Sequence, residues 1–121
     1  MFSLTSSFCY FLYRNPTDMR LGMDGLCGLV RGQLRRSPGS GEVFLFINKP
    51  RNKVKLLRWE EGGFILYYKR LEQGTFELPT FSLTATSCVL SWAELVMIIE
   101  GISIQKIQRR KRFSKFSSYQ Q

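Results

Sequence analysis

The chain has 121 residues, of which 18 are basic and 9 acidic, so its formal net charge is +9, and it contains no histidine. This length allows a single domain with a modest core. The lack of histidine excludes a His-based catalytic triad, an imidazole acid–base catalyst and most zinc sites. Cys9, Cys27 and Cys88 are widely spaced and form no C-x-x-C pair, which favours reduced thiols over a disulfide framework or a zinc site.

Two apolar segments bear on localisation. Residues 8–13 have no basic region before them, and residues 88–99 are too short to span a bilayer and include Glu94. We therefore expect neither a signal peptide nor a membrane span. The protein should be cytoplasmic and should associate with the bacterial nucleoid when it is bound to DNA.

The first predicted elements are a strand over residues 8–13 and a helix that reaches Leu34. Asn15 and Pro16 end the strand, and Thr17 or Asp18 is suited to cap the helix. The spacing of one apolar stripe predicts the buried face of this helix. The stripe consists of Met19, Met23, Leu26, Val30 and Leu34.

Three glycines lie on the opposite side of the same helix: Gly25, Gly28 and Gly32. Each costs about 1 kcal/mol relative to alanine inside a helix. Either the helix is weak, or a second backbone approaches this side closely. Both interpretations stay open from the sequence.

Residues 43–48, 53–59 and 64–71 predict three consecutive strands after a loop over residues 35–41, and residues 74–78 are a further strand candidate. Four-residue loops over residues 49–52 and 60–63 would fix the register. One sheet face would then hold Val43, Leu45, Ile47, Val54, Leu56, Ile65 and Tyr67. The other would hold Phe44, Phe46, Lys53, Lys55, Leu57, Trp59, Phe64, Leu66, Tyr68 and Arg70.

A capping-box pattern, Ser91-x-x-Glu94, predicts a short helix over residues 92–100 that ends at Gly101. The fold class is therefore α+β: a small, mainly antiparallel sheet packed with one principal helix and a short C-terminal helix. We expect residues 1–105 to form the single domain and residues 106–121 to be a basic, disordered tail.

The positive charge is concentrated in two segments. Residues 48–71 contribute +5 and the residues after Glu100 contribute +6 to the total of +9, so the remainder sums to −2. Interleaved cationic and aromatic side chains suit nucleic acid, although a solubility surface is the alternative. The candidate DNA-binding residues are Lys49, Arg51, Lys53, Lys55, Arg58, Lys69 and Arg70 in the first segment, and Arg109, Arg110, Lys111 and Arg112 in the tail.

The aromatic residues of that segment also have two interpretations. Trp59, Phe64 and Tyr68 could offer stacking surfaces to bases. They could instead lie beneath the Trp92 helix as part of the core, with the cationic heads reaching past them to water. The second interpretation is the stronger one, because that short apolar helix needs a surface to pack on.

The sequence gives little support for catalysis. Asp18 and Asp24 would point in different directions on a helix, and Glu60 and Glu61 alternate in a turn. Phosphodiester chemistry with magnesium needs converging carboxylates. We expect no enzyme activity, no cofactor and no metal site.

Several motifs together resemble the TnpB accessory protein (Orf2-like) of the insertion sequence 66 transposon family. They are Pro16-Thr17-Asp18-Met19-Arg20 with Gly22 and Asp24-Gly25-Leu26, and Tyr68-Lys69-Arg70-Leu71 with Gly74 and Phe76.

The resemblance implies a non-catalytic accessory protein for DNA transposition and recombination. Its partners would be DNA at the element ends, the transposase of the same element, or both. The alternative is a protein-interaction module that contacts the transposase without binding DNA. Its expected partner-contact residues are Arg20, Gly25, Gly28 and Gly32.

Overall fold

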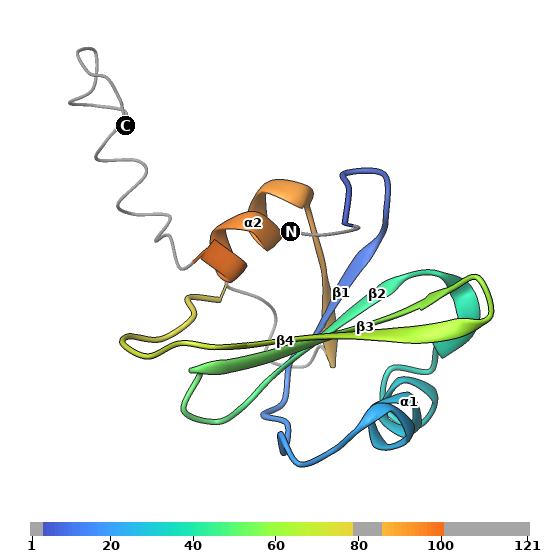
Figure 1. Ribbon diagram of the computed structural model, residues 1–121, viewed down its shortest axis with the longest axis horizontal. Helices are drawn as coiled ribbons and strands as arrows, with labels where there is room; N and C mark the ends of the chain where they lie inside the picture. Colours follow the sequence, from blue (N-terminus) through green and yellow to red (C-terminus); the bar gives the residue numbers. More distant parts are fainter. Residues whose placement is uncertain (1–3, 79–85, 101–121) are drawn as a thin grey trace.

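The protein is a five-stranded sheet with one helix packed on each face (Figure 1). The computed structural model describes residues 4–78 and 86–100. The elements confirm the predicted α+β class with a mainly antiparallel sheet. In chain order they are β1 (Tyr10–Tyr13), α1 (Met23–Gly32), the 3-10 helix η1 (Pro38–Ser40), β2 (Val43–Ile47), β3 (Lys53–Glu60), β4 (Gly63–Arg70), β5 (Ser87–Leu90) and α2 (Trp92–Glu100).

The strand order is β4-β3-β2-β1-β5, so the first strand lies inside the sheet. β1 and β2 are parallel, and every other neighbouring pair is antiparallel. The parallel pair requires a crossover connection, which residues 14–42 with α1 provide. We did not predict β5 from the sequence.

The strand expected over residues 74–78 is wrong. This segment instead lies beside the β2–β3 turn. The backbone N–H of Phe76 donates to the carbonyl of Arg51 at 2.7 Å. The Phe76 ring is fully buried, so a single anchored side chain replaces the expected ladder of hydrogen bonds.

The predicted register of the β2–β3–β4 meander is confirmed. Ile47 pairs with Val54, and Trp59 pairs with Phe64. The second connection is tighter than expected, because the loop is only Glu61 and Gly62, both with positive φ. Such a two-residue turn matches the twist of the strands that it joins and leaves the register unchanged.

Alternation along the strands builds two separate cores. The α2-side core includes Tyr10, Leu12, Val43, Leu45, Ile47, Val54, Leu56, Leu95, Ile98 and Ile99. The α1-side core consists of Phe11, Tyr13, Leu26, Cys27, Val30, Leu34, Phe44, Phe46 and Leu57.

The expected position of the meander aromatics beneath the Trp92 helix is wrong. Phe64 packs against the α1-side core, whereas Trp92 packs against the α2-side core, with its ring 5.9 Å from that of Tyr10. Trp59 contacts Phe64 edge to face at 5.0 Å. The sheet therefore separates these aromatics from α2, because strand alternation places Trp59 and Phe64 on the face that packs against α1.

Helix α1 begins at Met23, later than the predicted start at Thr17 or Asp18. Asp18 forms a local turn in place of a helix cap: its Oδ1 accepts the backbone N–H of Arg20 at 2.9 Å. Of the expected apolar stripe, Leu26, Val30 and Leu34 are buried, whereas Met23 is 40% exposed. Met23 is the first residue of α1, at the exposed end of the stripe.

The predicted helix over residues 92–100 is confirmed, including its cap. The Ser91 Oγ accepts the Glu94 N–H at 3.1 Å, and the Glu94 carboxylate accepts the Ser91 N–H at 2.9 Å. At the other end, the Lys69 ammonium donates to the Ile99 carbonyl at 2.6 Å. A cation here also opposes the negative end of the helix dipole.

We predict that Ser91→Ala lowers the free energy of unfolding by about 1 kcal/mol, because the first turn of α2 loses a side-chain acceptor. Urea unfolding followed by circular dichroism measures this change. Ser91→Asp serves as the control, since aspartate also caps helices and should keep most of the stability. Equal losses in both variants would show that the cap contributes little.

Candidate nucleic-acid interface

The site arises where β1 and β2 end. Because these strands are parallel neighbours, their carboxyl ends lie at the same edge of the sheet. The segments that follow them are residues 14–20 and the β2–β3 turn. A hydrogen bond from the Thr17 N–H to the Ile47 carbonyl, at 2.9 Å, joins the two segments directly. Thr17 is buried there, which fixes the position of its exposed neighbours.

The β2–β3 turn is organised by one asparagine. The Asn48 side-chain oxygen accepts the backbone N–H groups of Asn52 and Lys53, each at 3.0 Å, and its amide donates to the Asn52 side chain at 2.7 Å. Arg51 has φ 60°, in the left-handed region. These bonds hold Lys49 and Arg51 outward on a defined turn.

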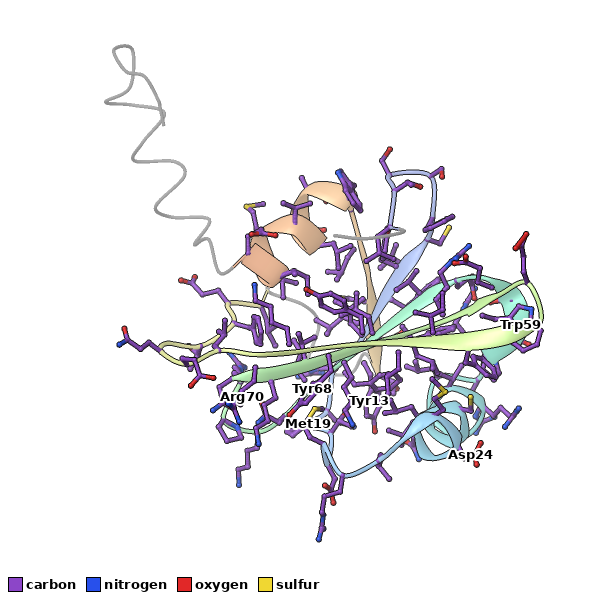
Figure 2. All side chains as sticks on the ribbon, viewed as in Figure 1. Tyr13, Met19, Asp24, Trp59, Tyr68 and Arg70 are labelled. Atoms are coloured by element: carbon purple, nitrogen blue, oxygen red, sulfur yellow. The ribbon has the colours of Figure 1, made fainter. Side chains whose placement is uncertain are left out.

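Residues 17–20, the turn and β4 line an open groove of about 450 Å³, which we call the basic groove. Figure 2 shows Met19, Tyr68 and Arg70 at this end of the β3–β4 hairpin and Trp59 at the other end. The groove is lined by Thr17, Asp18, Met19, Arg20, Asn48, Lys49, Pro50, Lys53 and Tyr68.

A smaller hollow of about 150 Å³ adjoins the groove through shared Asn48 and Lys49. It adds Arg14 and Arg51 to the lining. Together the two hollows present five cationic side chains and one carboxylate. This excess of positive charge in a concave surface is suited to attract a polyanion.

The one carboxylate, Asp18, is paired with Arg20. The Arg20 guanidinium donates to both carboxylate oxygens at 2.7–3.1 Å. The hydrogen bonds from Arg20 lower the pKa of Asp18 to about 2. Any stability that the carboxylate gives is therefore present above its usual pKa of 3.8 and is lost as the pH falls toward 2. The Arg20 side chain is 91% exposed and stays accessible to a ligand.

Lys55 differs from the other predicted DNA contacts, because its residue is only 9% exposed. Its ammonium donates to the Met19 carbonyl at 2.7 Å and to the Leu21 carbonyl at 2.9 Å. It also lies 5.2 Å from the centre of the Tyr68 ring. These contacts make Lys55 a structural residue that fixes the wall of the groove.

Two further residues predicted to contact DNA, Arg58 and Lys69, already form contacts within the protein on the α2 side of the sheet. Arg58 pairs with Glu60 and lies over the Phe8 ring at 4.0 Å, and Lys69 donates to the end of α2. Arg70 pairs across the strands with Lys53 and forms an exposed ion pair with Glu72 at 3.0 Å. Exposed pairs of this kind are weak, so Arg70 can exchange its partner. The tail residues Arg109, Arg110, Lys111 and Arg112 lie outside the described residues.

The expected partner-contact residues do not come together. Arg20 lies at the basic groove, whereas the three glycines lie on α1. A Cβ at Gly28 or Gly32 would meet open space, and one at Gly25 would meet the Leu21 side chain at 2.8 Å. Within the described part of the chain no second backbone approaches these glycines, which favours the weak-helix interpretation for the chain alone.

The described residues contain no group of three or more His, Cys, Asp or Glu side chains that could hold a metal ion. In the same part of the chain, no helix has the length and apolar character to cross a membrane.

Sequence reasoning missed Arg14 and Asn48 as parts of the site. Arg14 lines the smaller hollow, and Asn48 shapes both. The available signal was their position directly after the first and second strands. It becomes informative only once those strands are known to be parallel neighbours.

The geometry describes a small α+β protein with a localised basic groove. The family model described as "IS66 Orf2 like protein" matches residues 9–109, and the chain therefore belongs to that family. Membership supports an accessory role in the transposition of an insertion sequence.

Two relatives come from Sinorhizobium fredii. "Uncharacterized protein y4jC" is 32% identical over 95 residues, which cover 78% of this chain and 80% of the relative. "Uncharacterized protein y4hO" is 32% identical over 100 residues, covering 82% and 84%. No solved structure matches the chain.

We predict that Lys55→Met lowers the free energy of unfolding by about 2–3 kcal/mol, because two part-buried carbonyls lose a charged donor. Lys53→Met is the matched control on the same strand and face, and should change stability by less than about 0.5 kcal/mol. Urea unfolding of both variants measures the difference. Similar losses in the two variants would contradict a structural role for Lys55.

Proposed function

We propose that this protein assists transposition by binding DNA of the element through the basic groove. The observation that supports this most directly is the convergence of Arg20, Lys49 and Lys53 from two distant segments on one concave surface. Phosphate contacts of this type position a protein on DNA without reading its sequence. The proposed role is binding, with no cleavage of the strand.

The motifs of the family resemblance support the same surface. Residues 17–20 supply one wall of the groove, Tyr68 on β4 lines it as well, and Arg70 follows on the same strand. Residues far apart in the sequence thus meet at one place. This is expected when a ligand, and not only the core, constrains them, since most of these side chains are exposed.

The basic tail is a second source of charge for the same ligand. The hydrogen bond from Lys69 to the Ile99 carbonyl places the end of α2 beside β4. Lys69 is adjacent to Arg70, which pairs with Lys53 at the groove. The described part of the chain therefore ends beside β4, the strand that carries Tyr68 and Arg70.

A contact with the transposase is the alternative within the accessory role. The exposed Gly28 and Gly32 side of α1 is the surface proposed for it. A pull-down from nuclease-treated extract separates the two: a complex that survives nuclease is held by protein contacts, and one that is lost depends on nucleic acid.

We predict that binding to element-end DNA weakens steeply with salt, with a slope of about −0.9 in log–log form for each phosphate neutralised on duplex. Replacing Lys49, Arg51 and Lys53 by glutamine should reduce the slope by up to about 2.7. Gel shifts at several salt concentrations measure it. The matched control is Arg31→Gln on α1, which should leave the slope within error. No binding at low salt beyond that of a neutral protein would refute the DNA-binding proposal.

We also predict that Asp18→Asn strengthens DNA binding several-fold at low salt. The change removes the carboxylate from the groove and frees the Arg20 guanidinium from its ion pair. The amide oxygen of asparagine can still accept the backbone N–H of residue 20, so the local turn is kept. Asp24→Asn alters the net charge equally, but on the exposed side of α1, and should have a much smaller effect. Equal gains in both variants would indicate a response to net charge alone.

A further inference from the structure

Tyr68 is the exposed aromatic of the basic groove. This residue is 50% exposed, whereas every other aromatic residue that the structure describes is buried or partly buried. Trp59 and Phe64, the other two residues considered for stacking, contact each other at the opposite end of the hairpin, where Figure 2 shows Trp59. The stacking role considered for all three residues is therefore open to Tyr68 alone among them.

The ring of Tyr68 is held in place from one side. The Lys55 ammonium lies over it at 5.2 Å from the ring centre, and two backbone carbonyls fix that ammonium. Tyr68 also pairs with Lys55 across the strands. A flat side chain on a rigid strand, restrained by a fixed cation, loses little conformational freedom when a ligand stacks on it.

The surroundings of the ring are cationic and polar. Lys49, Lys53 and Arg20 line the same groove as Tyr68, and Asn48 adds an amide group. A phosphate backbone along these cations would place its bases against the groove. In a duplex the base faces are stacked on one another and unavailable, whereas an unpaired base offers its face to an aromatic ring.

We infer that the basic groove binds an unpaired segment of DNA, with one base stacked on Tyr68 and the flanking phosphates on Lys49, Lys53 and Arg20. This inference rests on the proposed function and narrows it from DNA in general to single-stranded DNA. It also separates two contributions. The cations give a salt-dependent affinity, and the ring gives an affinity that salt does not change.

The test compares three labelled DNAs by fluorescence anisotropy: a single strand of about 12 nucleotides, in the range of known single-strand sites, a blunt duplex of the same sequence, and that duplex with an unpaired extension. The wild type should bind the single strand and the extended duplex more tightly than the blunt duplex. Tyr68→Ala should weaken binding to the single strand roughly 5- to 150-fold, as expected for loss of one stacked base at about 1–3 kcal/mol. Its salt slope should stay that of the wild type.

Two controls keep the result interpretable. Tyr68→Phe retains the ring and should bind within about threefold of the wild type, since stacking needs no hydroxyl. Val89→Ala truncates a side chain that is 68% exposed on β5, across the sheet from the groove, and should bind normally. The ratio of extended to blunt duplex affinity is the readout that a general loss of stability would not change selectively.

The outcomes separate the two proposals. If Tyr68→Ala binds the single strand like the wild type while the Lys49, Arg51 and Lys53 replacement weakens all DNAs, the groove binds phosphates and the stacking inference is wrong. An equal preference of the wild type for blunt and extended duplexes would also overturn it. If the wild type binds none of the DNAs, the proposed function itself fails.

Discussion

The parallel pairing of β1 with β2 is the constraint on which the rest of the structure depends. An antiparallel neighbour would need only a tight turn, but a parallel one needs a crossover, and α1 fills it. The same pairing brings the chain after Tyr13 and the chain after Ile47 to one edge of the sheet. The groove is therefore a product of topology, and the hydrogen bond from Thr17 to Ile47 locks its two walls together.

Within that frame, the lysines of β3 have different roles although they lie two residues apart on one face. Lys53 reaches the groove surface, whereas Lys55 is enclosed by the segment before α1 and bonded to its carbonyls. A buried ammonium is stable only when its donors find acceptors. The turn at Asp18 provides them by leaving the Met19 and Leu21 carbonyls outside any helix. The cost is a shorter α1.

The sequence predicts local features of this fold well and distant ones poorly. Strand alternation and the turn residues identify the meander and its register, and Ser91 with Glu94 identifies the start of α2. The position of β5 and the burial of Lys55 depend on partners dozens of residues away, which no local pattern reveals. For the same reason the sequence indicates which cations form a charged segment. It does not indicate that Lys55, Arg58 and Lys69 bind other groups within the protein.

The place of β5 in the sheet has a consequence for chain synthesis. β1 is made first but obtains its second neighbour only from residues 87–90, while β2, β3 and β4 can pair with each other as soon as they emerge. A chain that stopped before Ser87 would keep the meander but leave β1 as an open edge and the α2-side core uncovered. An unpaired edge beside bare apolar residues promotes aggregation. Truncated copies of the gene would thus encode products that are prone to aggregation and degradation. They would not encode smaller functional domains.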